Sequence, residues 1–405
     1  MNLPVFIARR IKKPGIGTFS AMIHGIAIVN VAVGLCIMIV SVIIMIGFRN
    51  TIRDKVAAFN GHIEITKYTL NSTYEEVPLS REMESIQEAG NLPFIDHMQG
   101  VAHKVTVLKS GQEIQGVVFK GIGQDYDFER LLENIIEGGP VQFNDSTFST
   151  DILISKKISG LLNIHLHDEI LVYFIQNPVR IRRLNVCGIY DSGMEEFDEK
   201  IVFGDISIVQ QLNNWAPGQV GTIEIYIKNT DQIEFAEQTI FDITDYDLYV
   251  DNIKNKYAEL FDWLSLINRN VTILLVPLLA VISFNMISVL IILIMERTQM
   301  IGLLKALGAS NSQIRRIFIH NGTRLIYYGL FWGNLTGLGF GILQWKFKLI
   351  PLDPENYYMR FVPIQLDWPA IAGLNILILI IVSLTLYIPS IMISGIRPIK
   401  AIRFN

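Results

Sequence analysis

The sequence predicts a membrane α-helical fold with four transmembrane helices and a large mixed α/β extracytoplasmic domain inserted between helices 1 and 2. Hydrophobic residues make up 50% of the 405 residues and charged residues only 18%. Soluble domains carry about a quarter of their residues as charged types. Four stretches of 20 or more residues contain no Asp, Glu, Lys or Arg, and the long segment 48–270 separates the first two.

The charge-free stretches are residues 21–47, 271–295, 325–344 and 369–393. A helix of about 20 apolar residues crosses a hydrocarbon core of about 30 Å, so each stretch is long enough to span a bilayer. The predicted organisation is a cytoplasmic interfacial tail (1–20), a first span (21–47), an extracytoplasmic domain (48–270) with a stalk helix (252–270), a second span (271–295), a cytoplasmic loop (296–318), a third span (319–344), a short periplasmic loop (345–368), a fourth span (369–393) and a cytoplasmic tail (394–405).

The distribution of Lys and Arg predicts the orientation. The two tails and the loop 296–318 together carry eleven basic residues, whereas the loop 345–368 carries three. The positive-inside rule therefore places both termini and the loop 296–318 in the cytoplasm. The segment 48–270 holds 19 basic and 34 acidic residues, so it is an acidic extracytoplasmic domain that would repel nucleic acid.

The large domain alternates strand-like and helical patterns. Helices are expected at 127–136 and 231–241, among others. Two apolar strands, at 152–154 and 201–203, each lead into a helix N-cap, Ser155 or Asp205, which suggests an internal β-α duplication. Apolar residues at helical spacing run from 252 into the second span and predict one helix of about 40 residues, about 60 Å long.

The chain carries none of the common catalytic motifs. It has no phosphate-binding Gly-rich loop with Lys, no Gly-x-Ser-x-Gly, no His-Glu-x-x-His and no Cys-x-x-Cys. His165, His167 and Asp168 could be read as metal ligands, but such a group before a strand is more often a solvated turn. We therefore expect a non-catalytic subunit with no metal and no cofactor of its own.

The third span carries a row of glycines at every fourth position. Gly329, Gly333, Gly337 and Gly341 lie on one helix face, where they allow another backbone to approach closely. The row is either a seam that slides or a static packing face.

The loop 296–318 contains more apolar surface than a solvated turn needs. Met300, Ile301, Leu303, Leu304 and Leu307 lie in a short amphipathic stretch that ends at Gly308, and Ser310 is placed to cap a second helix. An exposed apolar surface of this kind favours a docking partner. The alternative is an ordinary connecting turn whose basic residues face lipid phosphates.

At this loop the sequence resembles the permease subunits of FtsX and MacB type ABC transporters. The segment reads Glu-Arg, then Ile301-Gly302, then Lys305-Ala306-Leu307-Gly308-Ala309, as in that family, and the C-terminal segment 397–403 is also similar. The segments 8–10, 45–49 and 61–65 are most similar to the lipoprotein-releasing branch. The resemblance extends over essentially the whole chain.

The resemblance implies a bacterial inner-membrane permease that extracts lipoproteins from the outer leaflet of the inner membrane for delivery toward the outer membrane. The implied partners are two copies of a separate ABC ATPase, which binds ATP and Mg, a second permease that is an identical copy or a homologue, membrane lipid, the lipoprotein substrate and a periplasmic lipoprotein carrier.

The resemblance also implies roles for particular residues. Those implied for ATPase coupling are Glu296, Arg297, Met300, Ile301, Gly302, Leu303, Lys305, Ala306, Gly308 and Ala309. Those implied for a cavity that binds the substrate's acyl chains are Val42, Met45, Phe48, Leu264, Ile267, Val271 and Leu275. The candidate carrier contacts are Asn177, Pro178 and Val179.

Two other functions remain open at the level of sequence. The segment 175–180, between two predicted strands, is short for a hairpin that holds a carrier. The first alternative is therefore a MacB-like mechanotransmission permease, which exports drugs, peptides or signals or regulates a periplasmic partner. The second alternative is a membrane-anchored receptor or scaffold without ATPase coupling, which the apolar surface of the loop 296–318 disfavours.

Overall fold

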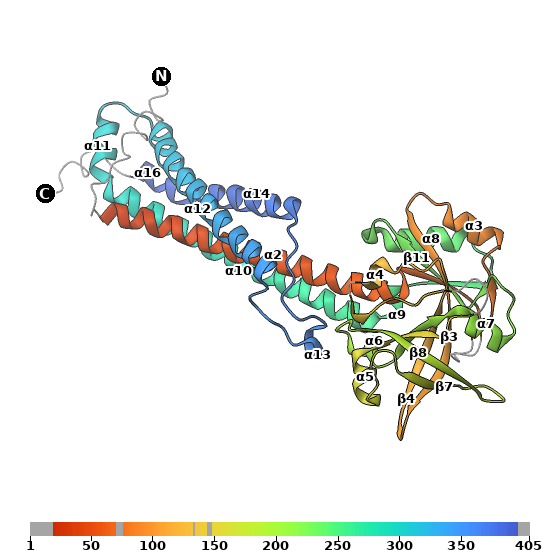
Figure 1. The fold of residues 1–405 in the computed structure, drawn as a ribbon. Coiled ribbons are helices and arrows are strands. Elements are labelled where there is room, and N and C mark those ends of the chain that lie inside the picture. The colour runs from red at the N-terminus through yellow and green to blue at the C-terminus, as the bar shows by residue number, and fades with distance from the viewer. Residues whose placement is uncertain (1–18, 70–75, 133, 144–147, 396–405) are drawn as a thin grey trace. The chain divides into compact units, whose positions relative to one another are not determined.

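The computed structural model describes residues 19–69, 76–132, 134–143 and 148–395 (Figure 1). The predicted tails 1–20 and 394–405 lie almost entirely outside these ranges. The chain divides into two compact units. We call residues 1–49, 263–351 and 361–405 the helical unit, and residues 50–262 and 352–360 the α/β unit.

In the part of the chain that the structure describes, the helical unit contains four long helices and three short ones. Its elements are α2 (Phe19–Asn60), α10 (Ala258–Glu296), α11 (Thr298–Ala306), α12 (Asn311–Phe347), α14 (Trp368–Thr385), α15 (Tyr387–Ser390) and α16 (Met392–Gly395). The first residues of α10 and the last of α2 belong to the α/β unit.

Among the described residues, three helices are long and apolar enough to cross a membrane: Met22–Asn60, Ala258–Glu296 and Trp368–Ser394. The predicted third span lies inside α12, which has 37 residues but is not among the three. The glycines, tyrosines and Asn334 of α12 make it less apolar than the other long helices. The structure thus supports three of the four expected spans by length and composition.

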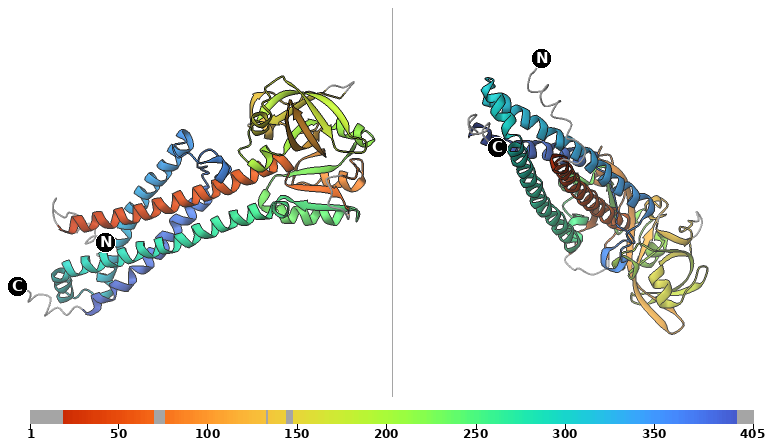
Figure 2. Two further views of the ribbon diagram at one scale, coloured as in Figure 1. Left: turned by 90° about the horizontal axis from the view of Figure 1, so that it is seen from below. Right: turned by 90° about the vertical axis from the view of Figure 1, so that its left-hand side faces the viewer.

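The core of the helical unit surrounds α2. Leu35, Met38 and Ile39 of α2 are fully buried and pack in one cluster with residues of α10, α12 and α14. One polar pair lies between α12 and α14: the Asn334 amide donates to Asn375 Oδ1 at 2.7 Å, and the Asn375 amide donates to Asn334 Oδ1 at 3.0 Å. Figure 2 shows these helices from two further directions.

The α/β unit contains a large mixed sheet of ten strands, in the order β12-β1-β11-β3-β4-β9-β6-β8-β5, with β7 pairing to both β3 and β8. These pairings close six strands, β3, β4, β9, β6, β8 and β7, into a ring. The strands are β1 (Ile63–Lys67), β3 (Ile95–Ser110), β4 (Glu113–Ile122), β5 (Ile135–Gly138), β6 (Asp151–Ser155), β7 (Glu169–Phe174), β8 (Arg180–Tyr190), β9 (Ile201–Asp205), β11 (Thr222–Ile227) and β12 (Leu248–Asn252).

Short helices and a second, two-stranded sheet complete this unit. They are α3 (Glu84–Gly90), α4 (Glu129–Leu132), α5 (Lys156–Leu162), α6 (Glu195–Asp198), α7 (Ile206–Asn213), α8 (Ile233–Ile243), α9 (Ile253–Lys256) and α13 (Pro354–Tyr357), the 3₁₀ turn η1 (Thr230–Gln232), and the strands β2 (Leu79–Ser80) and β10 (Gln219–Val220).

The predicted repeat of strand and helix is present in the structure. The Ser155 side chain caps α5 by accepting from Ile158 N, and the Asp205 carboxylate caps α7 by accepting from Ser207 N. The two preceding strands, β6 and β9, pair with each other in antiparallel register. Local capping chemistry was therefore readable from the sequence.

Three predicted boundaries were wrong. The helix expected at 127–136 ends at Leu132, and Ile135 and Ile136 lie in β5, which pairs with β8. Residue 252 ends a strand rather than beginning a stalk, and the backbone breaks again at Tyr257 before the 39 residues of α10. The first helix continues beyond Gly47 to Asn60.

The ends of the two longest helices connect to neighbouring strands. The C-terminus of α2 leads into β1, and β12 leads into α9 and α10. Strands β1 and β12 pair in antiparallel register, with Ile63 opposite Asn252. The Lys256 ammonium of α9 adds an ion pair to Glu64 of β1 at 2.7 Å.

A charged pair is buried beside the end of α2. The Lys120 ammonium donates to Glu224 Oε1 and to the backbone carbonyl of Phe59, and Gln99 Nε2 donates to the other Glu224 oxygen. The side chains of Lys120 and Glu224 are both 0% exposed. Complete pairing is what makes burial of two charges tolerable.

Candidate functional site

Helix α11 and its flanks form the predicted ATPase-coupling segment. Glu296 ends α10 and Arg297 lies at the N-cap of α11. Gly308 adopts a positive φ of 89° just after the helix, a conformation that favours glycine. Ser310 then begins α12 with a capping box, in which its side chain accepts from Gln313 N. The expected end and restart of helix are confirmed.

The structure divides the coupling residues between two faces. Ile301 and Gly302 are buried, and Met300, Leu304 and Ala309 pack against the core of the helical unit. Leu303 is 57% exposed and Leu307 76% exposed, and Glu296, Ala306 and Gly308 are also exposed. The outward face of α11 is therefore Leu303, Ala306 and Leu307, whereas Gly302 lies on the inner side.

Lys305 is bound within its own chain. Its ammonium donates to the Ile393 carbonyl at 2.7 Å and to the Ser394 carbonyl at 3.4 Å. These carbonyls belong to α16. Lys305 thus links α11 to α16 within the chain.

The residues implied for the acyl cavity lie along α2 and α10. Val42, Phe48 and Leu264 are buried, whereas Met45, Ile267, Val271 and Leu275 are half-buried. The rings of Phe48 and Trp263 meet edge to face with their centroids 5.8 Å apart. Val42 belongs to the core cluster of the helical unit, and Met45 and Leu275 pack against that cluster. Helix α10 also exposes Ile273 and Val276, which the sequence analysis did not single out.

The glycine row of α12 is seated on α2. A methyl group at Gly333 would lie 2.9 Å from the Ala32 carbonyl oxygen, and one at Gly337 would lie 3.3 Å from Cys36 Cα. Gly329 faces Val31 and Gly341 faces Ile43 in the same way. The row therefore packs against α2, and the closest backbone approach, at Gly333, leaves no room for a side chain.

The candidate carrier contacts lie in the short loop between β7 and β8. Asn177, Pro178 and Val179 are all exposed. Ile175 and Ile181 on either side are 51% and 52% exposed, so the tip of this hairpin presents apolar side chains. His165 and His167 are in a separate turn, and among the described residues no group of three or more His, Cys, Asp or Glu side chains is placed to hold a metal ion.

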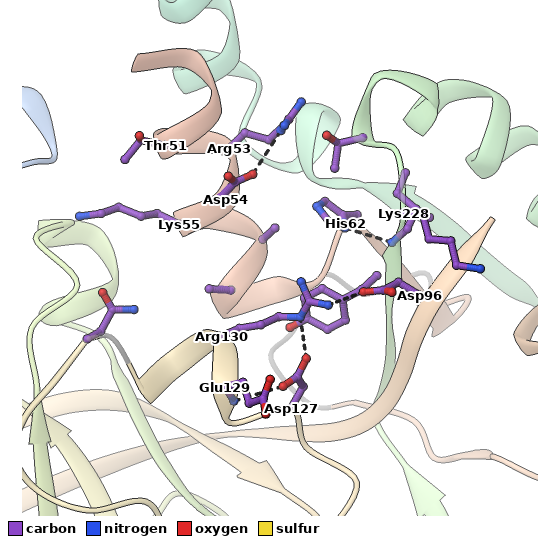
Figure 3. A pocket seen from close by; sticks show the side chains of 16 residues that line it. Thr51, Arg53, Asp54, Lys55, His62, Asp96, Asp127, Glu129, Arg130 and Lys228 are labelled. Carbon is purple, nitrogen blue, oxygen red and sulfur yellow. Dashed lines mark hydrogen bonds and ion pairs between the residues drawn. The ribbon is translucent and has the colours of Figure 1, made fainter. Parts of the chain in front are cut away.

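The α/β unit also contains a polar cavity of about 860 Å³, which the sequence analysis missed (Figure 3). Segments far apart in the chain line it, and only their folding brings them together. The lining residues are Thr51, Arg53, Asp54, Lys55, Ala57, Ala58, His62, Asp96, Asp127, Glu129, Arg130, Asn134, Tyr226, Ile227, Lys228 and Thr230.

Comparison with known proteins finds a family that matches the C-terminal part of the chain and relatives that match nearly the whole chain. The FtsX-like permease C-terminal family matches residues 272–398. The lipoprotein-releasing system transmembrane protein LolC of Xylella fastidiosa is 20% identical over 96% of this chain and 95% of its own length. LolE of Haemophilus influenzae is 22% identical over 95% of this chain and 94% of its own.

Two solved structures are similar to part of the chain. The extracellular domain of the noncanonic ABC-type transporter YknZ from Gram-positive bacteria covers 47% of this chain at 16% identity, with a TM-score of 0.34. The periplasmic region of MacB from Actinobacillus actinomycetemcomitans covers 50% at 13% identity, with a TM-score of 0.35. Residues 272–398 thus match the FtsX-like permease C-terminal family, and nearly the whole chain is similar to lipoprotein-releasing system transmembrane proteins.

Proposed function

We propose that this chain is the permease subunit of an ATP-driven ABC transporter that extracts lipoproteins from the outer leaflet of the inner membrane. The single observation that carries the proposal is the similarity to LolC and LolE proteins over at least 95% of the chain. The outward apolar face of α11 supports it, because a transporter subunit without a nucleotide site needs a surface on which an ATPase acts.

The proposed arrangement places α12 across the membrane as a fourth span. Its close seat on α2 supports this placement, because a helix packed along an apolar helix through glycines shares the apolar surroundings of that helix. Both termini and α11 then lie in the cytoplasm and the α/β unit in the periplasm. Two ATPase subunits, which bind ATP and Mg, and a second permease complete the assembly, and the exposed β7–β8 hairpin is the candidate contact for a soluble carrier.

Substitutions on the outward face of α11 test ATPase coupling more directly than a substitution at Gly302. Gly302 is buried, so a bulky residue there would disturb the helical unit and would not report docking alone. Replacing both Leu303 and Leu307 with Asp changes only exposed positions and should abolish co-purification of the ATPase. Leu161→Asp is the matched control, because Leu161 is 49% exposed on α5 of the α/β unit.

ATP-dependent release of a triacylated lipoprotein from proteoliposomes tests the transport itself. Liposomes that contain this chain with its co-purifying ATPase and second permease should release the lipoprotein with ATP, and the Leu303→Asp/Leu307→Asp variant should not. ATP hydrolysis without release would contradict lipoprotein extraction and favour export of another substrate. Unchanged ATPase association in the double variant would contradict the role of α11.

A further inference from the structure

The polar cavity of the α/β unit lies beside the continuation of α2. Thr51, Arg53 and Asp54 line it, and they follow the charge-free stretch that ends at Gly47 within one uninterrupted helix. At about 1.5 Å of rise per residue, the four residues from Gly47 to Thr51 cover about 6 Å. A headgroup layer is about 5–8 Å thick in each leaflet, so this part of α2 reaches the level of lipid headgroups when α2 crosses a bilayer.

His62 presents a hydrogen-bond donor to this cavity. Its side chain is 5% exposed, and its Nδ1 accepts from the Ile227 backbone N–H at 3.2 Å. A ring nitrogen that accepts from an N–H carries no proton, so the proton of the neutral imidazole is on Nε2. Among the described residues Nε2 has no hydrogen-bond partner, and burial lowers the His62 pKa to about 4, with Arg130 and Arg53 adding to the shift.

Arg130 lies next to His62 and is held in one orientation. Its Nε donates to Asp127 at 2.8 Å and one terminal nitrogen donates to Asp96 at 2.6 Å. The guanidinium is also stacked 4.3 Å from the centre of the Tyr226 ring. The two ion pairs account for two of the five N–H donors of Arg130, and Figure 3 shows another terminal nitrogen directed toward the space below His62.

The donors of Arg130 and His62 are fixed in place and can hydrogen-bond to a phosphate group. A planar guanidinium matches phosphate oxygens with forked hydrogen bonds, and His62 Nε2–H adds a neutral donor. The cavity as a whole, however, carries four basic and four acidic side chains. Among the acidic ones, Asp54 and Glu129 are exposed. A lining without net charge is matched by a ligand that carries both signs, rather than by a polyanion.

We infer that this cavity binds a zwitterionic phosphoethanolamine headgroup, with the phosphate at His62 and Arg130 and the ammonium at Asp54 or Glu129. The headgroup comes from a phospholipid, because the cavity begins at headgroup depth along α2. The strongly acidic character of the segment 48–270 also disfavours free anions. The inference rests on α2 crossing the membrane but does not depend on lipoprotein transport, so failure of the release assay would leave it standing.

The first test uses the full purified chain in detergent and a water-soluble probe, glycerophosphoethanolamine. Titration calorimetry should show saturable binding to the unaltered chain. His62→Asn keeps an acceptor near the Nδ1 position and removes the Nε2–H, and Arg130→Lys keeps the charge and removes the fork. Each should weaken binding by about tenfold, as expected for the loss of a hydrogen bond to a charged group.

Folding and specificity are controlled separately. Arg130 is 32% exposed, so Arg130→Lys is the safer variant, and the melting temperature of each variant shows whether it is folded. Lys200→Gln is the control outside the cavity, since Lys200 is 60% exposed, and it should bind as well as the unaltered chain. The inference would be overturned if the unaltered chain showed no saturable binding, or if both cavity variants bound the probe as tightly as the unaltered chain.

Two further arms separate the sources of the phosphate. Inorganic phosphate and glycerophosphoglycerol should bind at least about tenfold more weakly than glycerophosphoethanolamine, because neither brings an ammonium to the carboxylates. Equal binding of all three would reduce the cavity to a general anion site and contradict the proposal. In nanodiscs, native mass spectrometry should retain phosphatidylethanolamine in preference to phosphatidylglycerol, and the preference should disappear in Arg130→Lys.

Discussion

At the scale of single residues, His62 links burial to pH. Its folded pKa is about 4 because of burial, whereas an unfolded histidine has a pKa of about 6.5. The unfolded chain therefore takes up the proton first on acidification. Neutral His62 therefore costs no stability above about pH 6.5. As the pH falls from about 6.5 to about 4, the free energy of unfolding decreases by up to about 3 kcal/mol.

We predict that the free energy of unfolding of the full chain falls between pH 7.5 and pH 4.5 and falls less steeply in His62→Asn. Urea denaturation at several pH values measures both slopes. Burial raises the pKa of Asp198, which acts in the opposite direction, so only the difference between the two proteins reports on His62. Parallel slopes would show that His62 is already accessible to protons in the folded state.

The second prediction for single residues concerns the buried Lys120–Glu224 pair. Lys120→Met alone leaves a buried carboxylate without its cation and should lower the free energy of unfolding by about 3–5 kcal/mol. Adding Glu224→Gln removes the charge and keeps an acceptor for Gln99, so the double variant should recover most of the loss. Urea unfolding of the four proteins gives the coupling energy. Losses that simply add would mean that the two charges do not stabilise each other.

At the scale of elements, the contact between α12 and α2 depends on individual glycines. A methyl group at Gly333 would meet the Ala32 carbonyl oxygen and Leu35 Cβ, both at 2.9 Å, whereas one at Gly339 would meet nothing within 4 Å. Gly333→Ala should therefore separate the helices and cost about 1–3 kcal/mol. Gly339→Ala should be neutral or stabilising, since alanine is the better helix former.

Thermal unfolding in detergent compares the two substitutions on one helix. A clear drop in melting temperature is expected for Gly333→Ala and none for Gly339→Ala. If both variants melt like the unaltered chain, α12 does not rest on α2 as closely as the structure shows. The comparison isolates packing from helix propensity, because the chemical change is the same at both sites.

Elements that depend on neighbouring residues in the chain were predictable from the sequence. Features formed by residues far apart in the chain were not. Alternation along β7 and the caps at Ser155 and Asp205 were readable because each depends on neighbouring residues. The pattern at 127–136 fits a helix or a strand, and pairing with β8 decided it. Periodicity revealed an apolar α11 but not that Gly302 faces inward, since the covering residues come from other segments.

The cavity shows the same limit more strongly. His62 and Arg130 are 68 residues apart in the sequence, and neither carries a motif that points to a site. One signal was available: Thr51, Arg53, Asp54 and Lys55 are polar residues directly after a predicted span. The sequence analysis assigned them to the domain without recognising that α2 continues through them to Asn60.

At the scale of the whole molecule, the distribution of charge predicts the orientation. By the positive-inside rule, the excess of Lys and Arg in the segments that include α11 predicts that these segments are cytoplasmic and that the α/β unit lies on the other side of the membrane. Two strongly exposed positions allow this to be measured. Tyr246, between α8 and β12, is fully exposed, and Leu307, after α11, is 76% exposed.

Single cysteines at these positions should react with a membrane-impermeant maleimide from opposite sides. The two native cysteines are first replaced by serine, although burial already raises the pKa of Cys187 to about 12 and leaves little thiolate there. In cells whose outer membrane alone is permeabilised, Tyr246→Cys should be labelled at once. Leu307→Cys should be labelled only after the inner membrane is opened. Because both positions are exposed on the protein, their labelling depends only on the side of the membrane on which they lie. Labelling of Leu307→Cys in intact inner membranes would show the opposite orientation, in which a cytoplasmic ATPase could not reach α11.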